Sequence, residues 1–205
     1  MQGIALLKKL LVVLACTVAV AARADDIEVR NAQLVKVDEG LVLDANFSFD
    51  LNPRLEEAVS NGVPLYFVVD FELTRPRWWW LDEETVSRRL QMRLTYHALS
   101  RQYRLSTGLL QQSFGTLQEA LQVLQHVRNW LVADHGVTLS DTDYVAAVRM
   151  RLDTTLLPKP FQINALTSRE WRLESPWLRF KYHPPPPPPA PVETREPATL
   201  RGTQK

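Results

Sequence analysis

The fold class is decided by the stretch Leu65-Tyr-Phe-Val-Val-Asp-Phe-Glu-Leu73. Its odd-numbered residues are apolar, while Asp70 and Glu72 fall between them, and this period of two predicts a strand with one buried face. Similar alternation recurs in the ranges 27–37, 41–51, 90–96 and 144–152. About six or seven such strands must cover one another's apolar faces, so the sequence predicts a mainly β protein, an antiparallel β-sandwich of the immunoglobulin-like or C2-like kind.

Two helices are predicted between the strands. A short helix begins at Asn52-Pro53, an N-cap followed by proline at the first helical position, and ends at Asn61-Gly62. One long inserted helix begins at Thr116, which forms a capping box with Glu119, and continues until Gly136 ends it. Its apolar residues recur at helical spacing: Leu117, Ala120, Leu121, Leu124, Val127 and Leu131.

The two ends of the chain differ from the sandwich domain, which is predicted over residues 25–183. Residues 1–24 have the order of a secretory signal peptide: two lysines, an uncharged apolar run and Ala22-Arg23-Ala24. We expect cleavage between Ala24 and Asp25. Residues 184–205 begin with a run of prolines and contain few apolar residues, so they are predicted to form a disordered proline-rich tail. This tail would be a passive solubilising segment, a stiff spacer or a ligand for an aromatic groove.

Two alternatives concern the N-terminus. An uncleaved segment would anchor the protein in the inner membrane, although its apolar run is shorter than the roughly 20 residues that span a bilayer. The stretch Val13-Leu14-Ala15-Cys16 loosely resembles a lipobox, and acylation would then make Cys16 the anchored N-terminus.

Charge and cysteine content exclude several functional classes. Removing Lys8, Lys9 and Arg23 from the 24 basic residues leaves 21 against 23 acidic ones, a net charge of about −2. This balance argues against nucleic acid as a partner, because binding to phosphates depends on clustered Lys and Arg. Cys16 is the one cysteine of the sequence, so the cleaved protein would have no disulfide, thiolate metal site or cysteine nucleophile.

The main candidate for a binding surface is Trp78-Trp79-Trp80. Neighbouring side chains point to opposite faces of a strand and diverge by about 100° on a helix, so all three indoles cannot enter one core. We expect at least one indole at the surface, where it would contact a partner together with Arg75 and Arg77. The alternative is that two indoles cap the open end of the sandwich and the arginines stack on them.

A second candidate is a set of arginines on the polar faces of the predicted strands. If these strands are neighbours, they form one basic stripe that could bind anionic lipid or an acidic protein. Cross-strand ion pairs with Asp70 and Glu72 are the alternative interpretation. The arginines concerned are Arg89, Arg93, Arg104, Arg149 and Arg151.

Candidates for catalysis are few. Asp134-His135 and Asp141-Thr142-Asp143 could hold a cation or simply form a polar turn. The four histidines lack the paired spacing of metal ligands on one helix face; they are His97, His126, His135 and His183. Because no nucleophile elbow, phosphate loop or dinucleotide fingerprint occurs either, no catalytic residue, metal or cofactor is predicted.

Several motifs resemble an uncharacterised proteobacterial family, domain of unknown function four-three-nine-zero. The most specific is Arg75-Pro-Arg-Trp78 within the run from Asp70 to Glu83, and the resemblance covers about residues 25–182. It implies an exported protein, encoded beside a sensor kinase of the nitrogen-regulation type, and it supplies no catalytic residues. The other motifs are Leu157-Pro-Lys-Pro-Phe, Asn164-Ala-Leu and Trp171-Arg-Leu-Glu-Ser-Pro-Trp177.

From these observations we expect an exported, periplasmic binding or adaptor protein of the bacterial envelope. Its partner would be an envelope protein or an envelope surface component, with peripheral contact to the membrane as a further option. One alternative is an envelope hydrolase that uses a carboxylate pair drawn from Glu83, Glu84, Glu170 and Glu174. The other is a membrane-anchored accessory subunit of the sensor kinase.

Mass spectrometry of the mature N-terminus tests the predicted export signal. Signal-peptide cleavage should give a protein that starts at Asp25. A start at a modified Cys16 would instead establish an acylated, membrane-anchored protein, and an intact Met1 would contradict both forms of processing.

Overall fold

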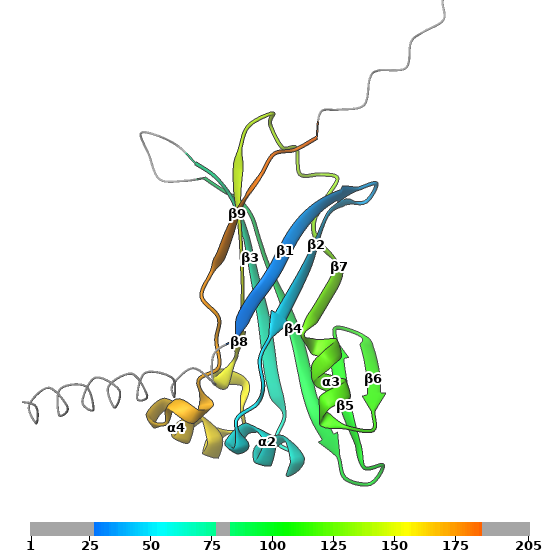
Figure 1. The fold of residues 1–205 in the computed structure, drawn as a ribbon, viewed down its shortest axis with the longest axis vertical. Helices are drawn as coiled ribbons and strands as arrows, with labels where there is room; N and C mark the ends of the chain where they lie inside the picture. Colours follow the sequence, from blue (N-terminus) through cyan, green and yellow to red (C-terminus); the bar gives the residue numbers. More distant parts are fainter. Residues whose placement is uncertain (1–26, 77–82, 186–205) are drawn as a thin grey trace, which may run out of the picture.

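Two antiparallel sheets form the body of the protein, and the computed structural model describes residues 27–76 and 83–185 (Figure 1). The smaller sheet has the strand order β1-β2-β7: Glu28–Val37, Gly40–Ser48 and His126–Asp134. The larger sheet has the order β6-β5-β4-β3-β8-β9: Leu110–Phe114, Gln102–Thr107, Glu83–His97, Leu65–Arg75, Tyr144–Leu152 and Leu178–Tyr182. The prediction of a mainly β protein built from antiparallel sheets is confirmed.

The two sheets share one apolar core. The alternating face of β3 that sequence analysis identified is fully buried, and Phe71 meets Trp130 of β7 edge-on at 6.4 Å between ring centroids. Phe49, which follows β2, stacks on Phe67 of β3 at 5.5 Å. Aromatic contacts therefore join the smaller sheet to β3, in the middle of the larger sheet.

Helices lie at one end and along one side of the sandwich. Figure 1 shows α2 (Pro53–Ser60) and α4 (Lys159–Thr167) together at one end. The predicted short helix is confirmed as α2, because the Asn52 side chain accepts a hydrogen bond from the Leu55 amide at 3.0 Å. Two 3-10 turns, η2 (Thr154–Leu156) and η3 (Arg169–Trp171), flank α4.

The long helix predicted from Thr116 is wrong in its extent. The capping bond exists, since the Glu119 amide donates to Thr116 Oγ1 at 3.2 Å, but α3 covers Leu117–Leu124 and the chain then becomes β7. The number of helices differs as well: two were predicted, whereas the described residues contain three, each of eight or nine residues. The helix that was not predicted is α4.

A bulge explains why β7 resembled a helix. Val127 and Val132 are five residues apart and would face opposite sides of a regular strand, yet both are buried. The register of β7 against β2 shifts twice, and Asn129 lies in this segment with a φ of 49°. The extra residue rotates the chain so that both valines reach the core, which disrupts the period of two.

The opposite face of the six-stranded sheet carries no covering layer in the part of the chain that the structure describes. The smaller sheet packs on one face of the larger sheet, and α3 continues that layer beside β5, β6 and β7 (Figure 1). Ala120, Leu121 and Leu124 of α3 are buried in the common core. The outer face therefore consists of strand side chains, of which Arg89 and Arg93 are exposed and Val68, Asp70 and Ala147 are buried.

Several predictions concern residues outside the described ranges. These are the signal peptide, Arg77, Trp78 to Trp80 and most of the proline-rich tail, and they remain predictions. Among the residues that the structure does describe, no helix is long and apolar enough to cross a membrane.

Replacing Phe71 tests the shared core. Phe71→Ala should lower the free energy of unfolding by about 3–5 kcal/mol, because the cavity would open between the two sheets. Denaturant unfolding followed by circular dichroism measures this loss. Leu99→Ala is the control, since Leu99 is 94% exposed and its removal should change stability by less than about 0.5 kcal/mol. Equal effects of the two substitutions would contradict this description of the core.

Candidate functional site

The outer face of the six-stranded sheet is organised around Asp70 at the middle of β3. Strand register places Arg89 of β4 directly opposite Asp70 on one side and Arg149 of β8 opposite it on the other. Arg151 lies two residues further along β8, on the same face. Adjacent strands thus bring three arginines to one carboxylate.

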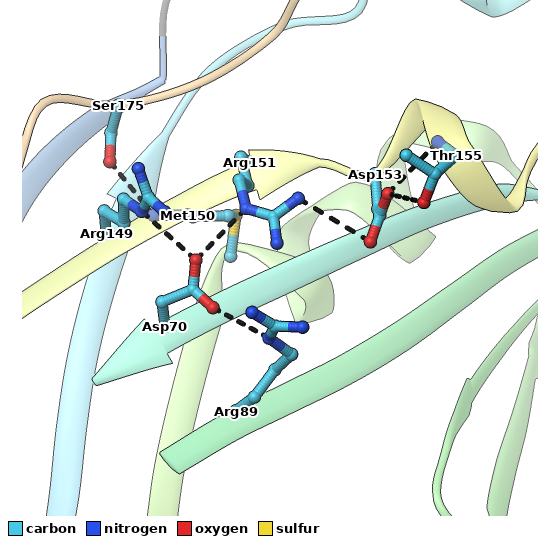
Figure 2. A network of polar contacts seen from close by, with 8 residues as sticks. All are labelled: Asp70, Arg89, Arg149, Met150, Arg151, Asp153, Thr155 and Ser175. Carbon is cyan, nitrogen blue, oxygen red and sulfur yellow. Dashed lines mark hydrogen bonds and ion pairs between the residues drawn. The ribbon is translucent and has the colours of Figure 1, made fainter. Parts of the chain in front are cut away.

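The contacts in this cluster are direct (Figure 2). Arg89 Nε donates to one carboxylate oxygen of Asp70 at 2.9 Å. Arg149 Nε and Arg151 Nε both donate to the other oxygen at 3.1 Å. The Asp70 side chain is only 10% exposed, so these hydrogen bonds replace most of its hydration.

The electrostatics of the cluster favour an ionised Asp70. Burial alone would raise the pKa of this carboxyl, but the hydrogen bonds from Arg89 and Arg151 and the nearby charges of Arg151 and Arg149 outweigh burial. The pKa of Asp70 is therefore held below its ordinary value of 3.8. Asp70, together with Asp153 beside Arg151, balances two of the three guanidinium charges, and the cluster keeps a positive excess.

Neighbouring side chains fix two of the arginines in place. Arg151 also reaches Asp153, with 3.6 Å between Nη1 and a carboxylate oxygen, and Asp153 in turn caps η2 by accepting from the Thr155 amide and hydroxyl. The guanidinium of Arg149 lies 4.6 Å from the ring centroid of Trp177, a cation–π contact. Both side chains are therefore ordered in advance of any binding.

Two further arginines on this face have no carboxylate partner among the described residues. Arg93 is exposed beside Tyr66 and Ser106 in an open groove of about 580 Å³. Arg104 of β5 has a buried Nε that makes no hydrogen bond within the described structure. The donors of Arg93 are available to an anionic ligand, whereas Arg104 Nε is shielded from solvent.

Cations outnumber acids over the whole face. Register places Arg179 and Lys181 of β9 on the same side as Arg149. The cations are Arg89, Arg93, Arg104, Arg149, Arg151, Arg179 and Lys181, and the acids are Asp70, Glu72, Glu84, Asp153 and Glu174. A surface of this composition attracts acidic partners.

A family model described as Domain of unknown function (DUF4390) matches residues 24–181. The chain belongs to this family. The match confirms the resemblance found in the sequence, and it extends from the predicted cleavage site into β9. No curated protein and no solved structure gives a significant match.

The DUF4390 domain brings some of the predicted site residues together and separates others. Arg89, Arg149 and Arg151 form the cross-strand ion pairs with Asp70 that were the alternative interpretation. Arg93 and Arg104 lie on the same face without a described carboxylate partner, so the two interpretations apply to different arginines. Arg75 lies apart: it pairs with Glu83 at the end of β3, nine residues from the position opposite Arg93, or about 30 Å. Arg77 and Trp78 to Trp80 lie outside the described residues.

The carboxylates considered for hydrolysis do not converge in the DUF4390 domain. Glu84 pairs with Thr74, and Glu174 bridges to Arg151 opposite Val68, so these acids lie six strand residues apart, about 20 Å. Glu170 lies in η3, near the end of the sheet that α2 covers.

Sequence reasoning missed two contacts of the DUF4390 domain. One is the stacking of Arg149 on Trp177. The other is His183, which bridges Asp141 and Asp143 at 3.1 Å each, so that a histidine side chain lies between the acids considered as cation ligands. No local motif reveals either pair, because the partners are far apart in the sequence. Within residues 27–76 and 83–185, no group of three or more His, Cys, Asp or Glu side chains is placed to hold a metal ion.

Removing the Asp70 charge should destabilise this DUF4390 domain. Asp70→Asn should cost about 2–3 kcal/mol at pH 7, less than the roughly 3–5 kcal/mol of a fully buried pair because Arg89 is largely exposed. Since the folded pKa is lowered, the stabilisation is complete above pH 3.8 and is lost as pH falls below it. Denaturant unfolding of both proteins as a function of pH should therefore show a difference that shrinks under acid conditions.

Glu72→Gln is the matched control for this measurement. Glu72 lies on the same face of β3 and has no ion pair among the described side chains, so its substitution should change stability by less than about 0.5 kcal/mol. Similar losses for both variants, or a difference that does not depend on pH, would contradict the role given to Asp70.

Proposed function

We propose that the protein is an exported binding or adaptor protein of the bacterial envelope, and that it recognises an acidic segment of a partner protein with the outer face of its six-stranded sheet. The observation that carries this proposal is the excess of arginine on a sheet face that no described element covers. Over the whole mature chain acids slightly outnumber bases, so the positive charge is concentrated on this face rather than spread over the surface.

The chemistry of the face suits carboxylates. A guanidinium group is planar and always charged, and it can bind a carboxylate through two parallel hydrogen bonds. Arg149 and Arg151 are already oriented by Trp177, Asp70 and Asp153, so binding would cost them little side-chain entropy. Arg93, which is exposed, would supply donors that no described carboxylate occupies.

The proposal also includes the location of the protein in the bacterial envelope. Residues 1–24 have the features of a signal peptide, and the sequence resemblance implies exported relatives encoded near a sensor kinase. A partner in envelope signalling agrees with both. Retention at the membrane through an uncleaved N-terminus or an acylated Cys16 is the variant of this proposal that analysis of the mature N-terminus distinguishes.

Crosslinking in cells followed by partner recovery tests the proposal. Arg93→Glu should reduce recovery of the specific partner about tenfold, because it places a repulsive charge at the centre of the face. Arg93 makes no ion pair among the described residues, so the variant should fold normally, and thermal unfolding verifies this. Arg30→Glu is the control: it makes the same charge change on β1, in the other sheet.

The same experiment includes Trp79→Ala, which tests the contact that the sequence predicted for Trp78 to Trp80. Equal recovery of the partner by wild type, Arg93→Glu and Arg30→Glu would contradict binding through the outer face. Loss of recovery with Trp79→Ala alone would transfer the site to the tryptophan segment.

A further inference from the structure

Strand β4 is much longer than the strand that flanks it. β4 covers Glu83–His97, and β5 pairs only with its last part, from Met92 to His97. On the side away from β3, no strand of the described chain pairs with Thr85–Gln91. This half of β4 therefore presents a row of unpaired backbone N–H and C=O groups.

The groove beside Arg93 lies at this free edge. Arg89, Leu90 and Gln91 all line it, together with Ser106 and Gly108 from the end of β5. Consecutive residues of a strand point to opposite faces, so a groove that three of them share exposes the edge of the strand itself. Gly108, with a φ of 58°, turns the chain back into β6, and the space beyond it continues the line of β5 along β4.

The charges along this edge have one sign. Between Thr85 and Arg93 there is no acidic residue, and Arg88, Arg89 and Arg93 are all exposed. Arg89 and Arg93 belong to the outer face, whereas Arg88 points to the other face. An acidic strand laid along this edge would meet arginine on both of its faces.

We propose that an extended acidic segment of the partner protein adds to the six-stranded sheet as a further strand beside Ser87–Gln91, in line with β5. The proposal rests on the proposed function and specifies the mode of binding: backbone hydrogen bonds to β4 supply affinity, and the arginines select acidic side chains. The partner segment would complete the groove at the point where β5 ends.

The other free edges of the sheets fit such a ligand less well. β6 carries no charged residue, and β9 lies in contact with β1. On β1, Glu28 and Arg30 pair with each other at 3.1 Å, so the charge of that edge is mixed. Between Thr85 and Gln91, the edge of β4 combines a groove with charges of a single sign.

A pair of synthetic peptides tests strand addition. The probe is a blocked peptide of about ten residues that repeats Val-Glu-Glu, so that glutamates point to both of its faces, and its control carries proline in place of two central valines. Proline donates no backbone hydrogen bond, so the control should bind at least about tenfold more weakly in a fluorescence anisotropy titration. Hydrogen exchange should show new protection at alternate amides between Val86 and Gln91 when the probe is bound.

Substitutions in the full-length protein define the charge requirement. Arg88→Glu should weaken the probe about fivefold, because it replaces an attractive cross-strand pair by a repulsive one. Arg30→Glu should leave the affinity unchanged.

Three outcomes would overturn strand addition. Equal binding of both peptides without new protection on β4 would exclude it and leave the arginine face as the binding surface. Absence of binding by either peptide would exclude it as well, while partner recovery by Arg93→Glu still tests the proposed function separately. Protection of Val86–Gln91 that depends on protein concentration alone would identify a second copy of this chain as the occupant of the edge.

Discussion

The carboxylate of Asp70 makes the outer face of the sheet compatible with a folded protein. Adjacent strands place Arg89, Arg149 and Arg151 close together, and without a negative charge at their centre these guanidinium groups would repel one another across the middle of the sheet. Because Asp70 lies on the central strand, its hydrogen bonds join β3 to both neighbours through side chains as well as through the backbone. Asp70 thus allows the arginines to lie close together on this face, where cations still outnumber acids.

The strands were predictable wherever the period of two was undisturbed. β2, β3, β4 and β8 each carry apolar residues on one face, and these residues form the core. β7 was missed because its bulge places Val127 and Val132 on the same side, and Leu131, which the helical pattern counted as apolar contact, is 44% exposed. α4 was missed because Pro158 and Pro160 at its start indicate a chain break as readily as the first turn of a helix.

The candidate site was predictable in composition and unpredictable in geometry. The polar positions of β4 and β8 identified the arginines of the outer face, but strand order cannot be read from one sequence. That order decides which arginines meet Asp70 and which stay unpaired. Part of β4 has a free edge because β5 is shorter than β4 and pairs only with its last residues. β5 is short because the chain turns at Gly108, which no hydrophobic pattern indicates.

The position of β8 has a consequence for how the chain folds. The ion pair between Asp70 and Arg149 joins residues 79 positions apart, and β3 and β8 pair along their length over a similar separation. Closing a loop of this size lowers the conformational entropy of the chain before native contacts stabilise it, so the high contact order should make folding slow. The ribosome must synthesise the chain as far as Leu152 before the centre of the larger sheet can close, and until then the apolar face of β3 lacks one of its two neighbours.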